Sequence, residues 1–245
     1  DAAPFELDAP ELIEKLNAFR KRAHLLLGNG SVKHKGDDAN AEARESLEGI
    51  CDIRNRMSAP RALAHNKFLV ICDDDKQPAM VWTGSTNWSM TGLCTQANNG
   101  VLVKSASIAA EYLAQWKALA EAGDATPETL RESNDIPRRA KNVTLWFTPL
   151  PGQDDLAQAR ELIMQARQGI LFVMFNPGPR GSLLNDIIEI ASPAGEHFNP
   201  ELYIQGVVNQ NPGTAANPVT LANRGKRIDA NADVVLPAAI EEPSK

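Results

Sequence analysis

Cysteine, aromatic residues and long apolar runs are all scarce in this chain of 245 residues. The three cysteines are Cys51, Cys72 and Cys94, and no two of them form a C-x-x-C pair. A disulfide framework or a zinc site is therefore not expected. No apolar run approaches the roughly twenty residues that a transmembrane helix needs. We therefore expect a soluble protein without a transmembrane segment; the sequence does not fix its compartment, and we favour the cytoplasm.

Basic residues are also too few for a general polyanion-binding surface. Lys and Arg total 25 against 31 Asp and Glu, which gives a formal net charge of −6. Binding driven by counterion release needs clustered cations. The two basic clusters, Arg20–Arg22 and Arg138–Arg139, are short, and we interpret each as a solvated helix face or linker. With 43% hydrophobic residues, the chain can nevertheless bury a substantial core.

Apolar spacing predicts alternating helices and strands in the first half of the chain. Asp8 and Pro10 are typical of a helix start. In chain order we expect a helix at 10–22, a strand at 24–27, a helix at 37–50, strands at 68–71, 79–82 and 101–103, and a helix capped by Ser107.

The periodicity is lost from Glu121 to Arg139, apart from one turn of helix opened by Thr126 and Pro127, which predicts a linker over 121–141. The pattern then restarts with a strand at 143–147, a helix capped by Asp154, a strand at 170–175, a helix from Ser182 and a strand at 202–208. Residues 176–181 are interpreted as a turn, with a ligand-facing loop as the alternative, and 209–223 as a surface loop. Apolar strands alternating with helices predict an α/β fold with a mixed, largely parallel sheet, covered by helices on both faces.

Polar residues stand at the ends of two neighbouring expected strands. His65 and Lys67 are two residues apart, as are Ser85 and Asn87. Side chains on a strand alternate between faces, so the members of each pair can share a face. Gly84 leaves room for a close approach of the backbone. An imidazole, an ammonium, a hydroxyl and an amide at one place would supply a nucleophile and hydrogen-bond donors for a phosphate group.

The order H-x-K followed by G-S-x-N resembles the signature of the phospholipase D superfamily, H-x-K-x4-D-x6-G-S-x-N. The continuation, Trp88–Leu93 and Gln96–Val101, is similar to that of its bacterial members. The resemblance implies a phosphodiesterase that uses no metal or cofactor. In that mechanism a histidine such as His65 is the nucleophile and becomes a phosphohistidine. Lys67 and Asn87 would hold phosphate oxygens, and Ser85 would position the loop or donate one bond.

The chain departs from this signature at two acidic positions. After Lys67 and a spacer of four residues stands Cys72, and the first carboxylate is Asp73, about 20 Å from Lys67 along an extended strand. We interpret Asp73 as a structural brace of the hairpin turn and Cys72 as an apolar substitute. Many family members carry an acid beyond G-S-x-N, where the best match here is Asn99. Gln96 is a further supporting candidate.

A second catalytic histidine is the third missing feature. His24, His34 and His197 do not stand in an H-x-K before an apolar run. Family enzymes are pseudo-dimers of two lobes or dimers of one. Residues 1–120 would then be the later part of one lobe, and residues 142–245 the opening part of a second lobe without its motif. The second histidine would come from a continuation of the second lobe beyond Lys245, which we favour, or from a homodimer partner.

The substrate class stays open at this stage, because phospholipid, nucleic acid and other phosphodiesters suit the same four residues. The alternative function is a non-catalytic phospholipase D-like module for binding or assembly. The shifted acid, Asn99 and the absent second H-x-K favour that alternative.

Overall fold

The computed structural model describes residues 1–208 apart from 32, 60–61, 141, 176 and 178–180. The chain divides into two compact units, Asp1–Gly152 and Gln153–Lys245. The loop predicted at 209–223 lies outside the described residues, as does most of the turn predicted at 176–181.

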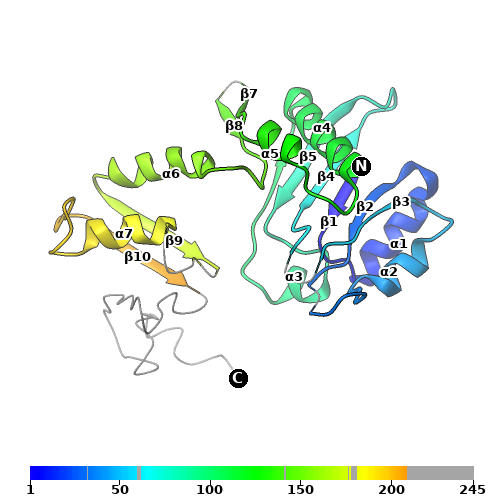
Figure 1. The fold of residues 1–245 in the computed structure, drawn as a ribbon, viewed down its shortest axis with the longest axis horizontal. Coiled ribbons are helices and arrows are strands. Elements are labelled where there is room, and N and C mark those ends of the chain that lie inside the picture. The colour runs from blue at the N-terminus through cyan, green and yellow to red at the C-terminus, as the bar shows by residue number, and fades with distance from the viewer. Residues whose placement is uncertain (32, 60–61, 141, 176, 178–180, 209–245) are drawn as a thin grey trace. The chain divides into compact units, whose positions relative to one another are not determined.

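A six-stranded sheet forms the centre of the first unit (Figure 1). Its spatial order is β3-β2-β1-β4-β5-β6, with bounds β1 Ala2–Pro4, β2 His24–Gly28, β3 Asp52–Arg56, β4 Lys67–Cys72, β5 Pro78–Gly84 and β6 Gly100–Val103. Strands β1, β2 and β3 are parallel, whereas β4 is antiparallel to β1 and β5, and β6 is antiparallel to β5. The predicted α/β class with a mixed sheet between helices is confirmed.

Helices cover both faces of this sheet (Figure 1). One face carries α1 (Pro10–Phe19) and α2 (Ala41–Leu47), and the other carries α4 (Ala106–Ala122) and α5 (Glu128–Asn134); the 3-10 turn η1 spans Arg20–Arg22 and α3 spans Met90–Cys94. Side chains along β2 alternate between the two faces of the sheet and so pack in two different cores. Leu25 and Leu27 pack with side chains of α1 and α2, whereas Leu26 packs with α4. Fully burying each of these leucines contributes about 1.5–3 kcal/mol.

Two helix starts differ from the prediction. Helix α2 begins at Ala41 rather than at 37, because the Asn40 side chain bonds to distant backbone groups instead of extending the helix. Ser105, not Ser107, caps α4 by accepting a hydrogen bond from the Ile108 N–H at 3.4 Å. The Ser107 hydroxyl instead lies 3.1 Å from that of Ser105.

Residues 121–141 are not the linker that the sequence predicts. They contain α5 and β7 (Arg138–Ala140), and β7 pairs antiparallel with β8 (Val143–Leu145). Leu130 is 6% exposed within the α4 core. Asn134 is fully buried, and its amide donates to the Pro149 carbonyl at 3.0 Å. This packing orders the segment, so the first unit continues through Gly152.

The second unit pairs two parallel strands with two helices. Its elements are α6 Asp154–Met164, β9 Gly169–Met174, α7 Leu183–Ala191 and β10 Tyr203–Val208. Ser182 starts α7 as predicted, with a capping box to Asn185. The N-cap of α6 is Gln153, and Asp154 is its first residue rather than its cap.

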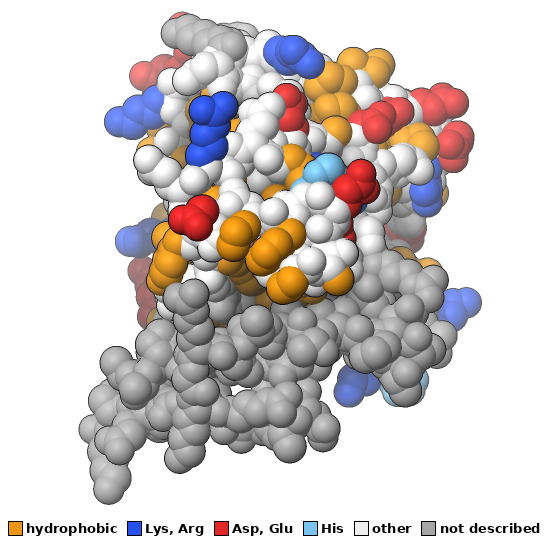
Figure 2. Space-filling model, turned by 90° about the vertical axis from the view of Figure 1, so that its left-hand side faces the viewer, with side chains coloured by type: hydrophobic (Ala, Val, Ile, Leu, Met, Phe, Trp, Pro, Cys, Tyr) orange, Lys and Arg blue, Asp and Glu red, His pale blue; other side chains and the backbone are white. Residues whose placement is uncertain are grey.

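One face of β9 stays exposed among the described residues, contrary to the prediction of cover on both faces. Leu171 and Val173 are each 76% exposed, whereas Ile170 is buried with Ile187 and Leu202. Figure 2 shows groups of hydrophobic side chains at the surface among charged ones. Across the described part of the chain, no helix is both long and apolar enough to cross a membrane.

Candidate active site

His65 and Lys67 meet at the aromatic ring of Phe5. His65 lies in the loop before β4, and its ring packs edge-on against Phe5 with 4.5 Å between the centroids. Lys67 is the first residue of β4, and its Nζ lies 4.8 Å from the same centroid. This Nζ also donates to the His65 carbonyl at 3.3 Å. His65 is exposed, whereas Lys67 is only 7% exposed.

The surroundings of both groups alter their protonation. Partial burial of the ring lowers the pKa of His65 from its usual 6.5, and repulsion from Lys67 lowers this pKa further. Burial lowers the pKa of Lys67 to about 8, against the opposing attraction of Glu6. Near pH 7 the site therefore combines a neutral imidazole, able to act as a nucleophile, with an ammonium that is still charged.

Asn87 joins this pair through Glu6. The Asn87 side-chain amide donates to a Glu6 carboxylate oxygen at 2.7 Å. Burial raises the pKa of Glu6, and repulsion from Asp8 adds to the rise, while Lys67 and the Asn87 hydrogen bond lower it. Among the described residues Glu6 and Lys67 form no direct ion pair, so their charges interact through space.

Ser85 faces a different set of partners. Its hydroxyl donates to Asn98 Oδ1 at 3.2 Å and accepts from the Asn99 N–H at 2.9 Å. Gln96 Oε1 accepts from the Asn98 amide at 3.1 Å. Ser85 thus meets the side chain of Asn98 and the backbone of Asn99. Within the described structure, no hydrogen bond joins Ser85 to the other three motif residues.

Gly84 brings the ends of β5 and β6 together. It pairs with Gly100, and its φ is +153°. A Cβ atom at Gly84 would lie 2.3 Å from the Asn99 carbonyl oxygen. The backbone approach expected from the sequence therefore requires glycine here.

Asp73 lies in the hairpin turn at the other end of β4. Its carboxylate accepts from the Gln77 N–H at 2.8 Å, and its own N–H donates to the Gln77 carbonyl at 2.9 Å. Cys72 packs against the α4 core. Both residues lie about a strand length from Lys67, Asp73 in the hairpin turn and Cys72 at the edge of the core.

The other histidines have surroundings of their own. His24 Nδ1 is 3.0 Å from the Asp1 carboxylate, and His34 and His197 are exposed. In the described structure none of them has a hydrogen bond or ring contact with His65. Within the described part of the first unit, neither His24 nor His34 contacts His65.

Comparison with known proteins identifies the family of the part of the chain that carries the motifs. Residues 8–120 match the family described as the cardiolipin synthase, phospholipase D-like domain. Residues 8–120 belong to the phospholipase D superfamily. Among curated proteins, no sequence matches.

This chain is also similar to two solved structures of low sequence identity. Polyphosphate kinase from Porphyromonas gingivalis matches with a TM-score of 0.50 and 13% identity over 84% of this chain, which spans 30% of the kinase chain. The phospholipase D family member Nuc from Salmonella typhimurium matches with a TM-score of 0.39 and 20% identity, covering 50% of this chain and 77% of Nuc.

Sequence reasoning missed Phe5 and Glu6, which precede the residues matched by the phospholipase D-like family. Neither belongs to the H-x-K or G-S-x-N motif, and Glu6 and Asn87 are 81 positions apart. The one available signal was the apolar-acidic alternation of Phe5, Glu6, Leu7 and Asp8, which places the even-numbered acids on one side of an extended segment.

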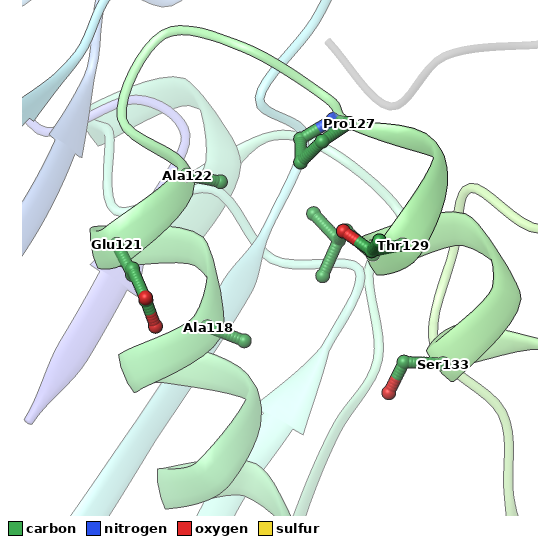
Figure 3. Close-up of a pocket in the computed structure, with 7 residues that line it drawn as sticks. Ala118, Glu121, Ala122, Pro127, Thr129 and Ser133 are labelled. Carbon is green, nitrogen blue, oxygen red and sulfur yellow. The ribbon is translucent and has the colours of Figure 1, made fainter.

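Surface hollows lie elsewhere on the phospholipase D-like unit. Figure 3 shows one between α4 and α5, where Glu121, Thr129 and Ser133 are at the wall. A second hollow adjoins α2 and β3. Neither contains a motif residue. No group of three or more His, Cys, Asp or Glu side chains among the described residues could hold a metal ion.

Proposed function

We propose that this chain carries the nucleophilic half of a phosphodiesterase of the phospholipase D type, with His65 as the nucleophile. The observation that supports this most is the meeting of an exposed neutral imidazole with a buried ammonium at Phe5. An accessible imidazole can reach a phosphorus atom, while the ammonium beside it attracts phosphate oxygens.

The reaction proceeds in two displacements. An imidazole nitrogen of His65 attacks phosphorus, a P–N bond forms and the bond to the leaving alcohol breaks, with an acid giving that alcohol its proton. Water then attacks phosphorus, the P–N bond breaks, and the same acid, now a base, takes the proton of the water. The products are the alcohol and a phosphate monoester.

Three further side chains assist this chemistry. Lys67 offsets the charge that develops on the non-bridging oxygens, and the Asn87 amide has a second N–H for the same group, since one is committed to Glu6. Ser85 holds the start of β6 through Asn98 and Asn99 and so positions the G-S-x-N loop.

The acid is a second histidine, because no other described group at the site matches its role. It comes from a second motif, either in a further lobe of the same polypeptide or in a homodimer partner. The second unit, residues 153–245, would be the opening of that further lobe, because residues 142–152 lie in the first unit.

Substrates are phosphodiesters, and phospholipid and nucleic acid are the two main classes. Turnover stimulated by phosphatidylcholine vesicles favours the first class, and salt-sensitive DNA binding with cleavage favours the second. The alternative function is a non-catalytic binding or assembly module, favoured by the shifted acid, by the absent second H-x-K and by the amide Asn99 at the position where many family members carry an acid, since a carboxylate would stabilise an imidazolium better.

The deciding experiment traps the covalent intermediate. Incubating the intact protein with bis-p-nitrophenyl phosphate and quenching it in alkali should leave an acid-labile phospho-adduct, located at His65 by mass spectrometry. His65→Ala should abolish the adduct and turnover, whereas the control His34→Ala, in an exposed loop, should leave both unchanged. If the intact protein gives neither adduct nor turnover, it is the binding module instead.

A further inference from the structure

Glu6 is an acidic side chain at the phosphate site that neither motif contains. It lies in the extended segment between β1 and α1, just before the residues that match the family. A carboxylate next to a phosphate site repels the ligand, so its presence there needs an explanation. Its contacts provide that explanation.

The first contact fixes the orientation of Asn87. The hydrogen bond from Asn87 Nδ2 to Glu6 is short at 2.7 Å, as expected for a charged acceptor. Asn87 Oδ1 is buried and has no partner among the described residues, so no other bond selects between the two amide orientations. A carboxylate accepts but cannot donate, so it holds Nδ2, not Oδ1, toward itself.

The second effect is on the charge of Lys67. This side chain is 7% exposed and packs against Phe5, and such burial favours the neutral amine. Glu6 is the charged group that opposes this, raising the pKa of Lys67. The other charged group facing Glu6 is Asp8, whose carboxylate already accepts the Met90 N–H at 2.8 Å.

The backbone holds Glu6 in place from both sides. The Glu6 carbonyl accepts the Trp88 N–H at 3.0 Å, and Leu7 forms a bridge with Trp88. The buried Asn40 side chain accepts the Leu7 N–H and donates to the Phe5 carbonyl, each at 2.9 Å. The carboxylate is therefore preorganised and needs no ligand to position it.

We propose that Glu6 is a positioning residue of the phosphate site. Its carboxylate holds the Asn87 amide with Nδ2 toward Glu6, and its charge balances the buried charge of Lys67. This inference rests on the proposed phosphodiesterase function. It assigns to Glu6 no bond to the substrate, since it acts through Asn87 and Lys67.

Two substitutions separate the two effects. Glu6→Gln keeps an oxygen that can accept from Asn87 but removes the charge, whereas Glu6→Ala removes both. In Glu6→Gln the alkaline limb of kcat/KM should move to lower pH, with kcat/KM near pH 6.5 within about threefold of wild type. Glu6→Ala should lose about 100-fold in kcat/KM at every pH, because Asn87 is misplaced. The control is Glu11→Gln, an exposed acid in α1, which should behave as wild type.

A direct titration keeps this inference separate from the proposed function. Lysine side chains are ¹³C-dimethylated and followed by NMR, with the Lys67 signal assigned from its loss in Lys67→Arg. Glu6→Gln should lower the pKa of Lys67 below the wild-type value of about 8. An unchanged Lys67 pKa in folded Glu6→Gln overturns the inference, even where turnover is normal. If wild type has no turnover but the shift is present, the proposed function fails and the pairing of Glu6 with Lys67 stands.

Discussion

Replacing Asn40 with alanine is expected to destabilise the first unit by about 3–5 kcal/mol. The side chain is 1% exposed and makes three hydrogen bonds of 2.9 Å, to the Leu7 N–H and to the Phe5 and Gly28 carbonyls. The Gly28 carbonyl keeps Arg44 as a second donor at 2.9 Å. The groups of Leu7 and Phe5 lose their described partner, and each buried unpaired group costs about 1–3 kcal/mol.

Urea unfolding followed by tryptophan fluorescence measures this loss in the first unit alone, because Trp82, Trp88, Trp116 and Trp146 all lie before residue 153. The midpoint should fall while the m-value stays constant. Asn17→Ala is the matched control, since the buried Asn17 Oδ1 has no partner in the described structure, and removing it should lower the free energy of unfolding by no more than about 0.5 kcal/mol. A loss below about 1 kcal/mol for Asn40→Ala refutes the reasoning that this side chain holds residues 5–7 in place.

Two further predictions concern the site itself. The kcat/KM for bis-p-nitrophenyl phosphate should decline above about pH 8 as Lys67 loses its proton, and should hold on the acid side to below pH 6.5, because the pKa of His65 is lowered from that value; an acid limb above 6.5 contradicts this. Gly84→Ala should cost about 1–3 kcal/mol in the same unfolding assay, since the methyl group meets the Asn99 carbonyl at a strained φ, and a change under about 0.5 kcal/mol contradicts the close approach of β5 and β6.

Local sequence was sufficient where apolar spacing and end signals agree. Apolar periodicity correctly predicted the two strands of the hairpin, the helix after Ser182 and the strand at 203–208, because the periodic apolar residues are the ones that pack in the cores. By contrast, β1 is three residues long and ends in proline, and β3 is rich in polar residues, so neither has a strand signature. Both strands form because a neighbouring strand supplies their hydrogen bonds.

The candidate site could be predicted only as far as its motifs reach. His65, Lys67, Ser85 and Asn87 are visible because they repeat a known spacing over short distances. Glu6 and Asn40 act through contacts 81 and 33 positions away in sequence, which no local pattern encodes. Leu130 was missed for a similar reason, because a short helix with one apolar anchor carries too little periodicity to be distinguished from a linker.

The position of β1 in the sheet also has a consequence for folding. Strand β1 is an inner strand of the sheet although it comes before the other described strands in the sequence, and one of its neighbours, β4, ends at Cys72. Closing such long loops costs entropy before any contact compensates for it, and it slows folding. Because Glu6 meets Asn87 only after this closure, the phosphate site should be among the last parts of the first unit to form. Recovery of activity after dilution from urea should therefore report complete folding of the first unit. A chain in which this unit is only partly folded should be inactive, because Glu6 and Asn87 are not yet in contact.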